Sequence, residues 1–195
     1  MSLQLSMNFK KHIWSCPAEY KDLSHAKEIA IDLETRDEGI GSNRGAGWAT
    51  GHGNIIGFAV AIEGWQGYYP FKHFGGGNMI PEQVKKYIKD VCALPCPKIF
   101  HNAQYDVGWL EQEGFKVNGD IIDTMVAAAI VDENRFSYSL NALSKDYLGE
   151  IKAETDLIIA AKEHGVDPKG EMWKLPAEYV GFYAEQDARL TYLLW

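Results

Sequence analysis

The stretch IAIDLET, at residues 29–35, decides how this chain of 195 residues folds. Its apolar run leads directly into two acidic residues, and a short apolar run of this kind predicts a buried strand. We predict a strand over residues 28–33 that ends at the acidic pair. Because side chains alternate across a strand, Asp32 and Glu34 should lie on one face while Leu33 points into the core.

Two later stretches carry acidic residues at helical spacing. Asn102 and Asp106 lie four residues apart. Tyr183 and Asp187 have the same spacing, and residues four apart share one face of a helix. The strand and the two helices can therefore direct their polar side chains at one point.

Four carboxylates gathered in one pocket would repel one another severely unless a cation lay among them. Oxygen ligands of this kind, with coordination positions left open, suit Mg²⁺ or Mn²⁺. Two such ions a few ångström apart are a common device for cleaving phosphodiesters. The sequence therefore predicts a metal-dependent nuclease.

The composition is that of one soluble globular domain, with 46% hydrophobic residues and no apolar run near the roughly 18 residues that span a membrane. Three cysteines, an odd number, argue against a disulfide framework and for a reducing compartment such as the cytoplasm. Cys92, Cys96 and His101 lack a nearby fourth ligand for zinc, so ordinary thiols are the favoured interpretation. The net charge of −8 argues against a long, non-specific DNA-binding groove.

The remaining pattern predicts an α/β fold, because three strands come first and helices with two short strands follow. The glycine-rich residues 35–54 should form an irregular, flexible rim over the site, in which Trp48 either stacks on a base or folds over the rim. Further strands are expected at residues 54–62, 67–71 (at a sheet edge), 98–100 and 120–122, and helices at residues 81–91, 101–114, 123–131, 139–148, 154–164 and from 176 onward.

The order Asp-x-Glu, Asn-x-x-x-Asp and Tyr-x-x-x-Asp resembles the three motifs of the DEDD 3′→5′ exonucleases, and the tyrosine is typical of the DEDDy branch. The resemblance extends over residues 27–195 and is greatest to the proofreading domain of family A DNA polymerases. It implies a ribonuclease H-like α/β fold, a mixed five-stranded sheet flanked by helices. The words that also match are IAIDLET (29–35), HNAQYD (101–106), DTM (123–125), YSLNAL (138–143) and YAEQDARLTY (183–192).

The resemblance also implies a domain organisation. Residues 1–26 would be an N-terminal extension, and residues 27–195 would be the exonuclease domain of a longer polymerase. The last predicted helix reaches Trp195 without a Gly, Asn or Pro stop signal, which is what a fragment of a longer chain would show.

By the same resemblance, each residue of the site receives a role. Asp32 would bridge two ions, Glu34 and Asp187 would complete the shell of the first ion, and Asp106 would hold the second. Tyr183 would orient the water that attacks the phosphodiester.

Three further residues, Thr35, Asn102 and Tyr105, would line the path of the terminal nucleotides by resemblance. Other interpretations remain open from the residues themselves. Asn102 would serve equally as a helix N-cap, and Tyr105 would serve equally as a core residue. For Asp123, the N-cap role is favoured over a role in the site.

We expect a two-metal 3′→5′ exonuclease that releases nucleoside 5′-monophosphates from single-stranded DNA ends. It would use Mg²⁺ or Mn²⁺, have a polymerase domain as its C-terminal partner, and act away from membranes in a bacterial or phage-infected cell. One alternative is a DEDDy exonuclease that acts on RNA, of the RNase D or Werner type. Another is an inactive relative that kept the fold as a spacer or partner-binding module, against which the intact carboxylates argue.

Overall fold

A mixed sheet of five strands forms the centre of the molecule, as predicted. The computed structural model describes residues 14–39, 44–152 and 154–195. The strands follow the order β3-β2-β1-β4-β5, in which β1, β2 and β3 pair antiparallel and β1, β4 and β5 pair parallel. Their bounds are β1 (Ile29–Asp37), β2 (Gly53–Ile62), β3 (Trp65–Pro70), β4 (Lys98–Phe100) and β5 (Ile121–Asp123).

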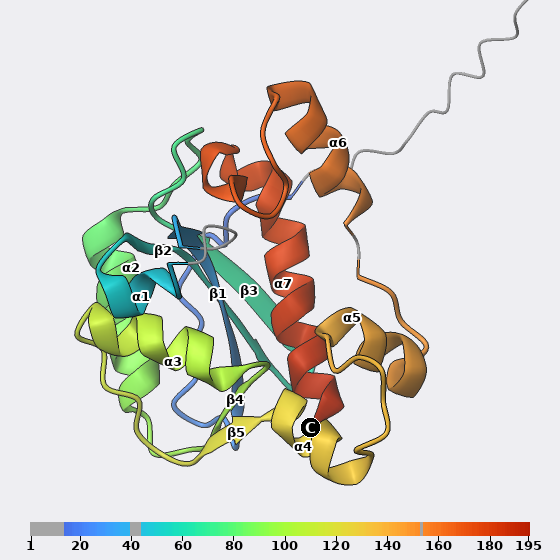
Figure 1. Cartoon of the computed structure of the whole chain (residues 1–195). Coiled ribbons are helices and arrows are strands. Elements are labelled where there is room, and N and C mark those ends of the chain that lie inside the picture. The colour runs from blue at the N-terminus through green and yellow to red at the C-terminus, as the bar shows by residue number, and fades with distance from the viewer. Residues whose placement is uncertain (1–13, 40–43, 153) are drawn as a thin grey trace, which may run out of the picture.

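Helices cover both faces of this sheet (Figure 1). Helices α1, α2 and α3 lie on one face, and α7 lies across the other, with α5 and α6 against it. The helices are α1 (Gly47–Thr50), α2 (Pro81–Ala93), α3 (Ala103–Gln112), α4 (Thr124–Val131), α5 (Leu140–Leu143), α6 (Thr155–His164) and α7 (Ala177–Leu194), with a π-helical turn at Ser144–Leu148 and a 3₁₀ turn, η2, at Met172–Lys174. The helices predicted from the sequence are all present.

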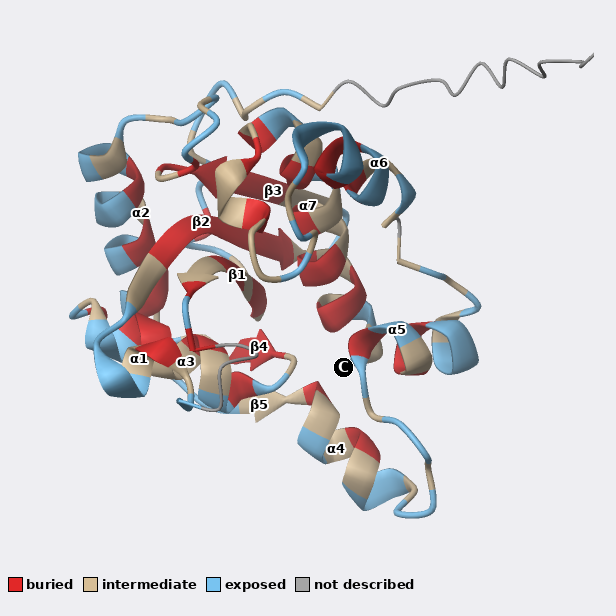
Figure 2. Ribbon diagram, turned by 45° about the horizontal axis from the view of Figure 1, so that its top comes forward, coloured by how far each residue is buried: buried red, intermediate tan, exposed pale blue. Residues whose placement is uncertain are grey.

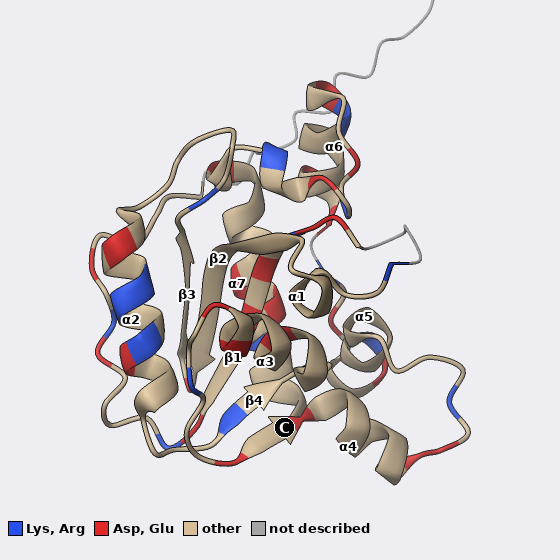
Figure 3. Cartoon of the chain, turned by 60° about the vertical axis from the view of Figure 1, so that its left-hand side comes forward, with Lys and Arg blue, Asp and Glu red and all other residues tan. Residues whose placement is uncertain are grey.

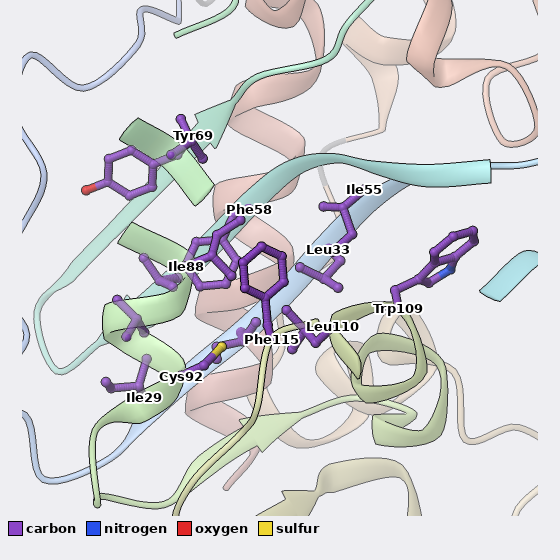
Figure 4. Close-up of a cluster of buried hydrophobic side chains, with 14 of the residues drawn as sticks. Ile29, Leu33, Ile55, Phe58, Tyr69, Ile88, Cys92, Trp109, Leu110 and Phe115 are labelled. Atoms are coloured by element: carbon purple, nitrogen blue, oxygen red, sulfur yellow. The ribbon is translucent and has the colours of Figure 1, made fainter. Parts of the chain in front are cut away.

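The alternation of side chains along β1 divides them between the two faces. Ile29, Ile31 and Leu33 are buried in the core between the sheet and helices α2 and α3. Figure 4 shows Ile29 and Leu33 in this core, and in Figure 2 the ribbons of β2, β3 and β4 mostly have the colour of buried residues. Burying one such side chain stabilises the fold by roughly 1.5–3 kcal/mol. Ala30 packs instead in the second core, against α7. Asp32 has the same parity as Ala30 and therefore lies on the face that α7 covers, opposite to Leu33, and the alternation along the strand predicted this opposition of Asp32 and Leu33.

The glycine-rich stretch is more regular than predicted. Strand β1 continues to Asp37 instead of ending at the acidic pair, because Arg36 pairs with Asn54 and Asp37 pairs with Gly53 of β2. The buried Asp37 carboxylate then accepts hydrogen bonds from the backbone amides of Gly39 and Gly47 and so holds the ends of the turn together. The prediction of an irregular loop was wrong for these parts, and residues 40–43 lie outside the described residues.

Trp48 packs into the protein, which agrees with the alternative that it folds over the rim and not with base stacking. The residue lies on the short helix α1 and packs against the core between the sheet and α3. Gly108 on α3 makes room for it, since a Cβ at that position would lie 2.5 Å from the indole ring. Contact between α1 and α3 therefore depends on the absence of a side chain at residue 108.

The described part of the N-terminal segment packs on the domain. The Trp14 indole donates a hydrogen bond of 2.9 Å to Glu185 of α7, Tyr20 stacks on Tyr69 at 5.3 Å between ring centroids, and Leu23 is buried. The predicted boundary after residue 26 stays a prediction. Among the described residues, no helix has both the length and the apolar character to cross a bilayer.

Candidate active site

The site forms where strand β1 extends beyond its pairing with strand β4. Strand β4 pairs with β1 only at Ile29 and Ala30, and α3 follows β4 directly. Asp106, on the first turn of α3, accepts a hydrogen bond of 3.1 Å from the backbone amide of Leu33. This bond fixes a buried carboxylate against the edge of β1, beside the acidic pair that the sequence singled out.

Helix α7 supplies the other two predicted residues, Tyr183 and Asp187, to the same place. Acidic residues lie midway along α7 and on the adjoining part of β1 (Figure 3). Glu34, Asp106 and Asp187 are buried, whereas Asp32 is half-buried. The four carboxylates lie close enough for their charges to shift one another's pKa values. The structure therefore brings the four predicted carboxylates into one cluster.

A cleft of about 460 Å³ reaches the cluster at Glu34, and its volume is within the usual range of a small-molecule site. Glu34 and Tyr183 line it, and so do Thr35 and Tyr105. The Tyr105 hydroxyl is shared between the Thr35 hydroxyl at 2.8 Å and the Asp37 carboxylate at 3.0 Å. Tyr105 thus belongs to the cleft wall, while its ring packs edge-on against Trp109 of the core at 6.4 Å.

Asn102 has an unusual backbone and occupies the predicted N-cap position of α3, but its side chain does not cap the helix. Its φ is 69°, the only positive value among the described non-glycine residues, and its side chain makes no capping hydrogen bond. The Asp123 carboxylate accepts instead from the amides of Asn102 at 3.1 Å and Ala103 at 2.8 Å, and also from Met125 at 2.9 Å. The predicted N-cap role of Asp123 is confirmed, and this one carboxylate serves the starts of both α3 and α4.

Burial and mutual repulsion raise the pKa values of the clustered carboxylates. Burial and, second, the charge of Asp187 raise the pKa of Asp32 to about 8, even though Lys152 partly opposes both. The pKa values of Glu34 and Asp106 are raised by burial first and by the charge of Asp32 second. When no metal is bound, the cluster therefore retains protons near neutral pH, and these protons belong to the coupled carboxylates together and not to any single one.

We expect the free energy of unfolding of the metal-free protein to fall as the pH rises from about 4 to about 8. In this window the native state keeps a proton that the unfolded state, with an aspartate pKa of about 3.9, has released. The slope should reach about 1.4 kcal/mol per pH unit for each such proton. Urea unfolding in EDTA at several pH values measures it, and Asp32→Asn should flatten the curve. Parallel curves for the two proteins would contradict the assignment.

Lys152 is a member of the site that the sequence did not reveal. Its ammonium forms an ion pair with Asp187, donates a hydrogen bond of 3.0 Å to the Tyr183 hydroxyl and lies 4.7 Å from the centroid of that ring. Burial by itself would lower the pKa of Lys152, but its interactions with Asp187, Asp32 and Glu34 together outweigh burial, and the pKa is raised. A lysine between a glycine and a helix has no diagnostic spacing, so no sequence signal marked it.

The donor set fits a divalent cation, although the side chains do not surround one as they lie. The second oxygen of Asp187, Oδ1, is buried and has no hydrogen-bond partner among residues 14–39, 44–152 and 154–195. An orphaned carboxylate oxygen among other carboxylates is what a hard cation requires. Within the same ranges, no three His, Cys, Asp or Glu side chains are arranged to hold a metal. The Lys152 ammonium forms an ion pair with Asp187 at the position where a metal ion would be expected.

Comparison with known proteins identifies the family. The family model of a 3′–5′ exonuclease matches residues 18–195. The chain belongs to this exonuclease family. A DNA-directed DNA polymerase of Pseudomonas phage M6 is 36% identical over 169 residues, 85% of this chain and 26% of that polymerase. DNA polymerase DpoZ of Salmonella phage PMBT28 is 27% identical over 186 residues, 91% of the chain and 27% of that polymerase. The exonuclease chain thus spans about a quarter of the length of these relatives, and the predicted resemblance to family A polymerases is confirmed.

Solved structures confirm the ribonuclease H-like fold of this exonuclease domain. RNase D of Trypanosoma brucei is 22% identical with a TM-score of 0.62, covering 88% of the chain and 57% of that structure. NrnC of Brucella melitensis, solved with bound Mg²⁺, is 17% identical with a TM-score of 0.55, covering 89% of the chain and 74% of that structure. At these identities the likeness shows the fold alone.

Proposed function

We propose that this exonuclease domain is a metal-dependent 3′→5′ exonuclease that removes nucleoside 5′-monophosphates from single-stranded DNA ends, as the proofreading part of a DNA polymerase. The observation that carries the proposal is the cluster of four carboxylates from β1, α3 and α7, namely Asp32, Glu34, Asp106 and Asp187, beside a cleft that Glu34 and Tyr183 line. An inactive relative would have no reason to keep four carboxylates that repel one another.

Each side chain has a distinct part in the proposed reaction. Asp32, Glu34 and Asp187 would hold one divalent ion, and Asp106 together with Asp32 would hold a second. Bound ions of this kind lower the pKa of a coordinated water and stabilise charge on the scissile phosphate. The Tyr183 hydroxyl would hold the attacking water in line with the phosphorus atom.

The wall of the cleft would position the terminal nucleotide. Thr35 and Tyr105 present hydroxyl groups that are already hydrogen-bonded to each other and so fixed in place. Asn102, at the start of α3, has a left-handed backbone and a side chain that makes no capping hydrogen bond. Non-glycine residues with a left-handed backbone cluster at active sites and ligand clamps, which supports a substrate contact for Asn102.

The test is cleavage of single-stranded oligonucleotides labelled at the 5′ end, with Mn²⁺ or EDTA. We expect a ladder that shortens from the 3′ end, with 5′-mononucleotides as products and no cleavage in EDTA. Cleavage of an RNA strand of the same sequence tests the alternative substrate. Faster cleavage of RNA than of DNA would favour an RNA exonuclease of the RNase D type. Absence of cleavage of either strand with Mn²⁺ would contradict an active nuclease.

Divalent metal should also stabilise the folded protein. Mn²⁺ at a hundredfold excess over its Kd should raise the free energy of unfolding by about 2.7 kcal/mol, because the ion binds only the native cluster. Asp32→Ala should remove most of this gain, whereas Glu111→Ala, which removes an exposed carboxylate from α3, should keep it. Thermal melting with and without Mn²⁺ measures the effect. A melting temperature unaffected by millimolar Mn²⁺ would count against the site.

The lengths of the polymerase relatives support a proposal about organisation. We propose that a polymerase domain is the C-terminal partner of this exonuclease domain, that residues 1–26 are an extension preceding it, and that the protein acts in a bacterial or phage-infected cell.

A further inference from the structure

Lys152 is a cation placed among carboxylates that are proposed to hold metal. Its side chain is 11% exposed and that of Asp187 is 5% exposed, so the ion pair between them is shielded from water. A buried charge pair is retained at a cost in desolvation, and breaking it leaves an uncompensated charge. The ion pair between Lys152 and Asp187 therefore affects the charge balance inside the buried cluster.

Hydrogen bonds to helices α7 and α5 hold the backbone at Lys152 in this position. Glu150 forms two hydrogen bonds with Arg189, at 2.7 and 3.0 Å, and the Ile151 carbonyl accepts from Gln186 at 3.4 Å. The Lys152 amide donates to Asn141 at 3.3 Å. Residues 150–152 are thus fastened along α7 and α5, and the Lys152 side chain is delivered to the cluster by fixed backbone.

The ammonium reaches one oxygen of Asp187 and the hydroxyl of Tyr183 at once. Electrostatic attraction to Asp32 and Glu34 adds to that of Asp187. A divalent ion held by Asp187 would occupy the same negative region as this ammonium. Two cations cannot share it without strong repulsion.

We infer that Lys152 is a built-in counter-cation of the metal-free site, and that a divalent ion must displace it from Asp187 to bind. The inference rests on the proposed metal site. Lys152 acts as a positioning residue, which holds Asp187 and Tyr183 together until the ion arrives. It also sets the concentration of ion at which the site fills.

The test compares Mn²⁺ affinity, by isothermal titration calorimetry without nucleic acid, in Lys152→Met, Lys152→Arg and the parent. Methionine keeps the length of the stem and removes the charge, so Mn²⁺ should bind at least about tenfold more tightly, ~1.4 kcal/mol. Arginine should bind Asp187 through its planar fork and weaken Mn²⁺ binding below that of the parent. The control, Lys86→Met, removes the same charge from an exposed pair on α2 and should leave the affinity unchanged.

The outcomes separate the two proposals. If the parent binds no Mn²⁺, both the proposed function and this inference fail. If the parent binds Mn²⁺ and neither Lys152 variant changes the affinity, only the inference is overturned, and Lys152 merely packs in the site. If Lys152→Met folds only with Mn²⁺ present, the ion replaces the missing ammonium and the inference is supported. If Lys152→Met does not fold at all, the arginine variant decides, and affinity equal to or above that of the parent overturns the inference.

Discussion

Replacing Asp187 with asparagine should lower the rate of 3′-end cleavage by at least about a thousandfold, which corresponds to ~4 kcal/mol of transition-state stabilisation. Asp187 is the carboxylate from α7 that approaches the acidic pair of β1, and one of its oxygens has no partner in the described structure. Asparagine keeps the size of the side chain and an acceptor for Lys152, so the change removes charge with little effect on packing. Single-turnover cleavage of a labelled DNA strand measures the rate.

The matched control lies on the same helix. Glu178→Gln removes an exposed carboxylate from the first turn of α7 and should leave the cleavage rate within about twofold of the parent, because surface substitutions of this kind have small effects. Comparable cleavage by Asp187→Asn and the parent would show that α7 contributes no ligand. The proposed metal shell would then be wrong.

Replacing Tyr183 with phenylalanine should slow cleavage by about 10- to 1000-fold while Mn²⁺ still binds. The hydroxyl is the only atom removed, and it accepts a hydrogen bond from Lys152 at 3.0 Å inside the cleft. A water-positioning group contributes to the transition state and contributes little to metal affinity. Single-turnover rates at saturating Mn²⁺, with calorimetry in parallel, separate the two effects.

Tyr192→Phe is the control for Tyr183→Phe, since it removes a hydroxyl from the same helix near Glu28 and away from the cleft. It should retain the parent rate. A Tyr183→Phe variant that cleaves at the parent rate would show that the hydroxyl has no part in the reaction and that Tyr183 is a packing residue. A variant that loses both cleavage and Mn²⁺ binding would place the hydroxyl in the metal shell instead.

Much of the site could be predicted from the sequence because its spacing is short and regular. A period of two along β1 places Asp32 and Glu34 on one face, and a period near four places Tyr183 and Asp187 on one face of α7. These are local rules that survive folding. That the strand and the helices meet at one place does not follow from local spacing. This part of the prediction came from the resemblance to a family.

Other features depended on contacts that no local pattern encodes. Strand β1 continues past the acidic pair to Asp37, into the start of the glycine-rich stretch, because β2 pairs with it there, and this tertiary pairing overrides the weak strand propensity of the sequence. The cap on α3 comes from Asp123, on a strand that lies 20 residues further along the chain from Ala103. Lys152 enters the site because residues 150–152 are fastened to α7. Each of these required the fold to be known first.

The most direct test of the central claim, that the four carboxylates hold divalent metal in the cleft, is a crystal structure with Mn²⁺ and a nucleoside 5′-monophosphate, using the anomalous signal of manganese. We predict an anomalous peak with carboxylate oxygens of Asp32 and Asp187 at about 2.1 Å, and the Lys152 ammonium moved away from Asp187. Crystals saturated with Mn²⁺ that show no peak at the cluster, with Lys152 still paired to Asp187, would contradict the claim.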